Sequence, residues 1–145
     1  MNIKTNVGKG KVLCIDFDGV IHGYSHGWKD GNIYDEPVEG AKEALEELIE
    51  SGYEVLIYST RCNPEYLEPG DPDRVEAVKD YLKKHSIPYS KIHTGSKPKA
   101  FAYIDDRSIS FRGDWNDTLE KVKVFETWNR PGAKSSAEIE KEENI

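Results

Sequence analysis

Two pairs of aspartates carry the first chemical signal in the sequence. Asp16 and Asp18 come at the end of the apolar run VLCI, and Asp105 and Asp106 follow the run FAYI. Apolar runs of this kind are typical of strands that are buried in a parallel sheet. In an open α/β sheet, ligands bind beyond the carboxyl ends of the strands, so both pairs are expected at one edge of the sheet.

Up to four carboxylates would then share one crevice. At an effective dielectric constant of about 20, each pair of like charges about 4 Å apart costs about 4 kcal/mol. Such a cluster persists only if some carboxylates are protonated or a cation lies among them. Ligation by carboxylate oxygens alone favours Mg²⁺ over zinc or copper. The spacing therefore predicts a Mg²⁺ site, with Asp16, Asp18, Asp105 and Asp106 as its candidate ligands.

Hydroxyl and amine groups occur at comparable positions. Ser59 and Thr60 follow the apolar run of residues 53–58, and Lys97 comes shortly before the second acidic pair. A hydroxyl and an amine can bind the oxygens of a phosphoryl group, while Mg²⁺ screens that group from an attacking acid. Two alternatives stay open, Thr60 in place of Ser59 and Lys99 in place of Lys97.

The elements that must position these groups alternate between strand and helix. Strands are expected over residues 11–17, 53–58, around 92, 101–105 and 109–111, and helices over 37–52, 73–85 and 114–128. Alternation of this kind predicts right-handed crossovers between parallel strands. The expected fold is therefore α/β, a three-layer Rossmann-like parallel sheet with helices on both faces.

The chain has 145 residues, which is enough for one domain and too few for two well-packed ones. We predict a loose lead-in over residues 1–10, a single domain over 11–130 and a disordered acidic tail over 131–145. The net charge of −7 argues against tight binding along a nucleic-acid backbone. Two cysteines are too few for a disulfide scaffold, and no apolar run is long enough for a membrane span, so a cytoplasmic location is expected.

Four motifs, in this order, resemble the haloacid dehalogenase-like (HAD) phosphohydrolase superfamily, and in particular its small members without a cap domain. They are DFDGV at residues 16–20, an apolar strand that ends in Ser59-x-Arg61, KPKA at 97–100 and YIDDR at 103–107. They span roughly two-thirds of the chain. One loop, one helix and one strand fill each long stretch between motifs, which leaves no room for a cap domain.

The resemblance implies that residues 11–130 form a catalytic domain, a Mg²⁺-dependent hydrolase that cleaves a phosphomonoester through an aspartyl-phosphate. Asp16 would be the nucleophile, and Asp18 the general acid and then the base. Ser59 and Lys97 would bind the phosphoryl oxygens. The Mg²⁺ would be held by Asp16, by Asp105, by the backbone carbonyl of Asp18, and by Asp106 directly or through water.

We expect the loops that border the crevice to determine the substrate specificity. Arg61 and Arg107 could grip a further phosphate or carboxylate, and Thr60 could contact the substrate as well. Without a cap the site is open unless a second copy of the chain covers it. This suits a small phosphate bound by a homo-oligomer, or a phosphate on a large molecule such as a polynucleotide end, although the charge disfavours nucleic acid. In residues 22–36, the side chains that could stack on or hydrogen-bond a substrate are His22, Tyr24, His26 and Trp28.

Two functions of other classes are kept as alternatives. A receiver-like phospho-acceptor uses the same groups, but it carries its phosphorylated aspartate after a middle strand. Here the acid pairs follow the first and the fourth predicted strands. A catalytically silent regulatory or binding module would keep the fold without turnover. The complete set of motifs favours the hydrolase.

Overall fold

The computed structural model describes residues 6–129 of the chain. The chain divides into two compact units, residues 1–105 and residues 106–145. Residues 6–10 of the expected lead-in form turns. The expected acidic tail over 131–145 lies outside the described residues, and a single domain over 11–130 stays a prediction.

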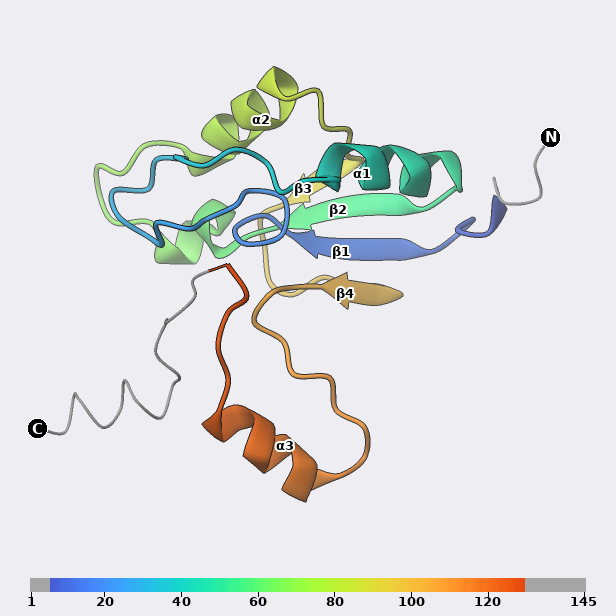
Figure 1. Cartoon of the computed structure of the whole chain (residues 1–145). Helices are drawn as coiled ribbons and strands as arrows, with labels where there is room; N and C mark the ends of the chain where they lie inside the picture. The colour runs from blue at the N-terminus through green and yellow to red at the C-terminus, as the bar shows by residue number, and fades with distance from the viewer. Residues whose placement is uncertain (1–5, 130–145) are drawn as a thin grey trace, which may run out of the picture. The chain divides into compact units, whose positions relative to one another are not determined.

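A four-stranded parallel sheet forms the centre of the first unit (Figure 1). It confirms the predicted α/β class, because β1 pairs in parallel with β2 and β4, and β2 pairs in parallel with β3. The central strand β1 has Ile15 opposite both Ile57 and Ile104. The strands lie in the order β3-β2-β1-β4, with bounds β1 Val12–Asp16, β2 Glu54–Tyr58, β3 Lys91–His93 and β4 Ala102–Ile104.

Two helices cover one face of this sheet, α1 Ala41–Glu50 and α2 Arg74–Lys84 (Figure 1). The strand order explains this, because two right-handed crossovers that step in the same direction, from β1 to β2 and from β2 to β3, place their helices on the same face. The helices and strands share one apolar core. Its buried side chains include Leu13 and Ile15 of β1, Val55 and Ile57 of β2, Leu45 of α1, and Val78, Tyr81 and Leu82 of α2.

Helix α1 begins later than the sequence predicts. Pro37, the expected first residue, forms a bridge with His22 instead, and the amide of Val38 donates to the carbonyl of Ile21 at 2.8 Å. Gly40 then has a φ of 87°, a left-handed conformation that precedes the helix. Residues 37–38 therefore close the loop after β1, and the helix begins only beyond Gly40.

The second unit contains helix α3 Trp115–Lys123, which Asp114 caps through hydrogen bonds from the amides of Asn116 and Asp117. The predicted end at residue 128 is wrong, because the β-branched and aromatic residues from Val124 onward do not extend the helix. Since α3 belongs to this unit, a helical layer on the other face of the sheet stays a prediction. No helix among the described residues is long and apolar enough to cross a membrane.

The short strand predicted at residues 109–111 does not form. Ile109 and Phe111 alternate with serine and arginine, a pattern compatible with a strand. Among the described residues, however, no neighbouring strand pairs with this segment. So short a strand is not stable without a partner strand. The alternating pattern was therefore not sufficient to predict a strand here.

Candidate active site

Three carboxylates meet where β1 and β4 end. Asp16 is the last residue of β1, and Asp105 directly follows β4. Because β1 and β4 are parallel neighbours with Ile15 beside Ile104, their pairing itself brings positions 16 and 105 together. One oxygen of Asp16, one of Asp105 and one of the next residue, Asp106, all lie within 4.8 Å of one another.

The spacing of these oxygens fits a divalent cation. Two ligands of one Mg²⁺ lie at most about 4.2 Å apart, since each is about 2.1 Å from the ion, whereas Ca²⁺ allows about 5 Å. The limit of 4.8 Å on the separations of the three oxygens lies within the reach of Ca²⁺ and close to that of Mg²⁺. The group is thus a candidate metal centre made of carboxylate oxygens.

The pKa of the buried Cys14 thiol is affected by the charged groups around this centre. Cys14 precedes Asp16 by two residues, so both side chains lie on the same face of β1. Burial raises the pKa of the thiol, the carboxylates of Asp16 and Asp105 raise it further, and the ammonium of Lys97 lowers it. Lys97 and both aspartates therefore all lie near Cys14. Its Nζ lies 4.3 Å from the ring centre of Tyr103, the residue opposite Cys14 on β4.

Ser59 occupies the same edge of the sheet, directly after β2. The last residue of β2, Tyr58, lies opposite Asp16 in the parallel pairing. Ser59 is buried, and its extended backbone leads into the short 3₁₀-helix η2 Thr60–Cys62. Ser59 is thus a buried residue with a hydroxyl group, and it follows β2 at the edge of the sheet where β1 also ends.

Three further residues from the sequence prediction, Thr60, Lys99 and Arg107, are exposed. Thr60 directly follows Ser59 and lines a pocket. Lys99 lies on the surface, two residues after Lys97. Arg107 is exposed too, and it belongs to the second unit. The choice of Ser59 over Thr60, and of Lys97 over Lys99, stays a prediction.

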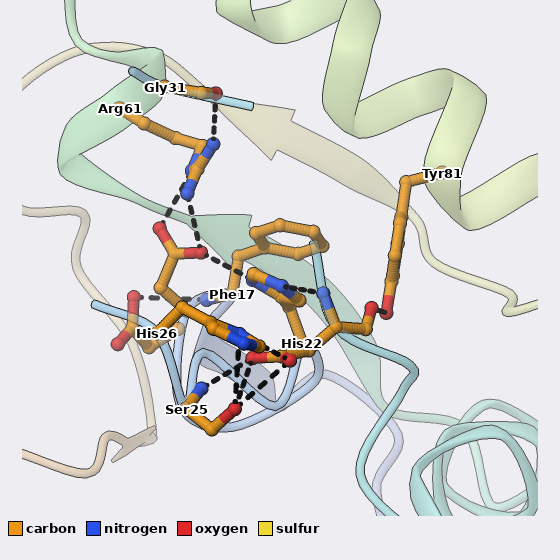
Figure 2. A network of polar contacts seen from close by, with 10 residues as sticks. Phe17, His22, Ser25, His26, Gly31, Arg61 and Tyr81 are labelled. Atoms are coloured by element: carbon orange, nitrogen blue, oxygen red, sulfur yellow. Dashed lines mark hydrogen bonds and ion pairs between the residues drawn. The ribbon is translucent and has the colours of Figure 1, made fainter. Parts of the chain in front are cut away.

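The Asp18 carboxylate is held by an arginine and a histidine (Figure 2). Arg61 donates two hydrogen bonds to it, from Nε to Oδ2 at 2.7 Å and from Nη2 to Oδ1 at 2.8 Å. Nδ1 of His22 lies 2.8 Å from the same Oδ1. The Asp18 side chain is not one of the grouped carboxylates, and its role as a metal ligand stays a prediction.

The structure corrects the expected role of Arg61. Its side chain is only 2% exposed, and all three of its nitrogens donate within the protein. Nη1 donates to the carbonyl of Gly31 at 2.8 Å, while the other two hold Asp18. Arg61 is therefore not an exposed group available to bind a phosphate or carboxylate of the substrate. It fixes the loop after β1 to the turn after β2.

His22 is corrected in the same way. It is 2% exposed, and its Nε2 accepts a hydrogen bond of 3.0 Å from the amide of Asp35. A nitrogen that accepts cannot carry the proton of the neutral ring, so the proton is on Nδ1 and is donated to Asp18. The ring also stacks on Phe17. His22 therefore positions Asp18 and does not face a substrate.

Asp18 is ionised at neutral pH in these surroundings. Burial by itself raises its pKa, but hydrogen bonds from His22 and Arg61, together with the charge of Arg61, outweigh burial. The pKa of Asp18 consequently lies below its ordinary value. The carboxylate is thus kept in the form that accepts a proton.

We expect the stabilisation provided by Asp18 to disappear in acid. Since its folded-state pKa lies below the unfolded value of about 3.9, the stabilisation is fully present above about pH 4 and is lost as the pH falls through the folded-state pKa. Urea unfolding of wild type and Asp18→Asn from neutral to acidic pH measures this. The difference in free energy of unfolding between the two proteins should shrink below about pH 4, and a constant difference would contradict the prediction.

The loop over residues 23–36 is tied to the rest of the unit at several points. Its ends meet where the amide of Gly23 donates to the carbonyl of Glu36 at 3.2 Å. The hydroxyl of Tyr81 donates to the carbonyl of Asp35 at 2.9 Å, and Ser25 and His26 contact the Asp35 carboxylate (Figure 2). Neither Asp35 nor Tyr81 is among the site residues predicted from the sequence. No local pattern links two residues so far apart in the chain.

Comparison with known proteins shows no family for this chain. The chain is similar to a crystal structure of an MCSG target from Vibrio cholerae, with 23% sequence identity and a TM-score of 0.46, over 76% of this chain and 94% of that one. No model of a known protein family matches the sequence, and no curated protein matches it.

Proposed function

We propose that the protein is a Mg²⁺-dependent phosphatase that hydrolyses a phosphomonoester through an aspartyl-phosphate on Asp16. The observation that carries the proposal is the group of Asp16, Asp105 and Asp106, with oxygens within 4.8 Å of one another. Lys97 supports it, because its charge acts on the same buried thiol as those of Asp16 and Asp105. The order of the motifs, which resembles that of the HAD phosphohydrolases, favours the same reaction.

The proposed reaction has two displacements at phosphorus. A carboxylate oxygen of Asp16 attacks the phosphorus, the bond to the leaving oxygen breaks, and the alcohol departs with a proton. Water then attacks the phosphorus of the acyl phosphate, the bond to Asp16 breaks, and inorganic phosphate is released. Ser59 and Lys97 would hold the phosphoryl oxygens in both steps by hydrogen bonding and charge.

Asp18 is proposed to move the protons of both steps. Because Arg61 and His22 hold it ionised, it suits the base that takes a proton from the attacking water. In the first displacement the leaving oxygen needs a proton. A phosphomonoester monoanion can bring one, since the second pKa of such a group is about 6. Asp18 would pass this proton to the leaving oxygen.

A bound Mg²⁺ would add charge stabilisation at the phosphoryl oxygens. The residues that would hold it are Asp16, Asp105 and Asp106. We choose Mg²⁺ over Ca²⁺ because it is the usual partner of one or two carboxylates together with substrate phosphate oxygens.

Turnover of p-nitrophenyl phosphate that requires Mg²⁺ is the result we expect. EDTA should abolish it, and added Mg²⁺ should restore it. In Asp105→Asn the Mg²⁺ concentration for half-maximal activity should rise by at least about tenfold, since changing even an outer-shell partner costs about 10–100-fold. Calorimetric titration with Mg²⁺, and with Ca²⁺ in parallel, measures metal binding independently of activity.

Asp80→Asn is the matched control, since Asp80 is an exposed carboxylate on α2 outside the grouped carboxylates. It should leave both titrations unchanged. Turnover that survives EDTA would overturn the proposal. An aspartyl-phosphate that lasts for hours would favour the receiver-like function, and Mg²⁺ binding without turnover of a broad panel of phosphates would favour the silent module.

A further inference from the structure

A pocket of about 430 Å³ borders Arg61 and is not used by the proposed reaction. It is formed by the loop over residues 23–36, the segment after β2 and the beginning of α2. Trp28, Tyr66 and Leu67 give it apolar and aromatic walls, and Arg61, Asp71 and Arg74 give it charge. A pocket with this lining suits a ligand that has both an apolar or planar part and a charged group.

Arg74, the first residue of α2, is a buried cation in this pocket. It is 9% exposed, and its Nε is enclosed without a hydrogen-bond partner. No carboxylate among the described residues forms an ion pair with it. Its guanidinium carbon lies 5.5 Å from the ring centre of Trp28, which offsets part of the charge. Burying a charge without a partner is unfavourable, and a cation at the first turn of a helix also opposes the helix dipole.

Gly31 presses the loop backbone against this guanidinium. Its φ is +86°, and a Cβ built there would lie 2.1 Å from Nη1 of Arg74. Glycine suits this backbone conformation, and a residue with a Cβ at this position would have to displace the Arg74 guanidinium. Since the carbonyl of Gly31 also accepts a hydrogen bond from Arg61, one turn of the loop holds both arginines at the pocket.

Arg61 and Arg74 differ in whether an ion pair compensates their charge. Arg61 is paired with Asp18, so its charge is already compensated. Asp71 is an exposed carboxylate that accepts a hydrogen bond from the amide of Glu68 and forms no ion pair with Arg74. Arg74 therefore remains as the buried positive charge that a ligand could neutralise, and its Nε as the donor that a ligand could satisfy.

We propose that this pocket binds a second anionic group of the substrate, a phosphate or a carboxylate, on Arg74. An apolar or planar part of the same molecule would lie against Trp28 and Tyr66. Guanidinium groups bind both anions through paired, charge-assisted hydrogen bonds. The proposal rests on the proposed function in one respect, because the first phosphate is the one cleaved at Asp16. It narrows the substrate class from any phosphomonoester to one with two anionic groups.

The test compares matched ligands on the full chain in EDTA, where no turnover is expected. Adenosine 3′,5′-bisphosphate is compared with adenosine 5′-monophosphate, and 4-carboxyphenyl phosphate with phenyl phosphate, by calorimetric titration. The first pair tests a second phosphate and the second pair a carboxylate. In at least one pair the ligand with two anionic groups should bind wild type about tenfold more tightly, the gain of one charge-assisted hydrogen bond.

Arg74→Gln should abolish this preference and leave the affinity for the ligand with a single anionic group unchanged. Arg74→Lys should keep part of the preference, because lysine retains the positive charge but lacks the paired donors of the guanidinium. Lys79→Gln, on the exposed surface of α2, is the matched control and should keep all of it. Equal affinity of wild type for both members of each pair, or an unchanged preference in Arg74→Gln, would overturn the proposal.

Thermal unfolding provides a readout that does not depend on affinity fits. Without ligand, Arg74→Gln should melt at or above the wild-type Tm, because it removes a buried charge that has no ion pair. Adenosine 3′,5′-bisphosphate or 4-carboxyphenyl phosphate should raise the Tm of wild type more than that of Arg74→Gln. Equal increases would contradict the proposal.

The same measurements separate this pocket from the proposed function. An Arg74-dependent preference without hydrolysis of p-nitrophenyl phosphate or of a broad panel of phosphates would support the pocket and refute the phosphatase. Hydrolysis of p-nitrophenyl phosphate without such a preference would refute the pocket alone.

Discussion

Asp16→Asn should reduce kcat for p-nitrophenyl phosphate by at least about a thousandfold, the scale on which loss of a nucleophile acts in other enzymes. The amide cannot form the acyl phosphate, and it also removes one negative charge from the group with Asp105 and Asp106. Steady-state kinetics at saturating Mg²⁺ measure the loss. Rapid acid quench followed by mass spectrometry should find a phosphorylated Asp16 in wild type and no phosphorylated residue in the variant.

Comparison with Asp105→Asn separates the nucleophile from a metal ligand. High Mg²⁺ should restore part of the activity of Asp105→Asn and none of that of Asp16→Asn, since only the latter lacks the attacking oxygen. The control Asp80→Asn should retain wild-type kcat. If Asp16→Asn kept a tenth or more of the wild-type rate, Asp16 would not be the nucleophile.

Arg61→Met should lower the free energy of unfolding by about 3–5 kcal/mol, the usual effect of removing one partner from a buried ion pair. The variant leaves the Asp18 carboxylate with His22 as its remaining side-chain partner in Figure 2 and leaves the carbonyl of Gly31 without its hydrogen bond from Arg61. Urea unfolding followed by circular dichroism measures the change.

Two further variants show whether the lost pairing is the cause. Asp18→Asn combined with Arg61→Met should be less destabilised than the sum of the single variants, because the double variant has no unpaired carboxylate. Lys42→Met breaks an exposed pair with Glu46 on α1 and should change the free energy of unfolding by about 0–1 kcal/mol. A loss of under about 1 kcal/mol in Arg61→Met would show that the buried pair is not important for stability.

The acidic centre could be predicted from sequence because it depends on few contacts between residues far apart in the chain. Each aspartate ends an apolar run, and runs of that kind become parallel strands whose carboxyl ends lie at one edge. Once β1 and β4 pair, Asp16 and Asp105 are neighbours regardless of the loops. The prediction of a strand at residues 109–111 used the same reasoning and was wrong, because a strand also needs a partner.

The surroundings of Asp18 could not be predicted in this way. Whether Arg61 and His22 face the solvent or the interior depends on how the loop over residues 23–36 folds back over them. That depends on contacts such as those of Gly31 with both arginines and of Asp35 with Tyr81, which no periodicity encodes. Sequence patterns report which residues prefer to be buried, and arginine and histidine usually do not.

The loop over residues 23–36 begins and ends at one point, the bridge between His22 and Pro37. A chain closed at its base in this way can gain or lose residues at its exposed tip, near Lys29 and Asp30, without shifting the strands that carry the carboxylates. Insertions there could therefore change the selectivity of the proposed pocket without moving Asp16 or Asp105. Directed evolution toward new phosphate esters would do best to begin at that tip.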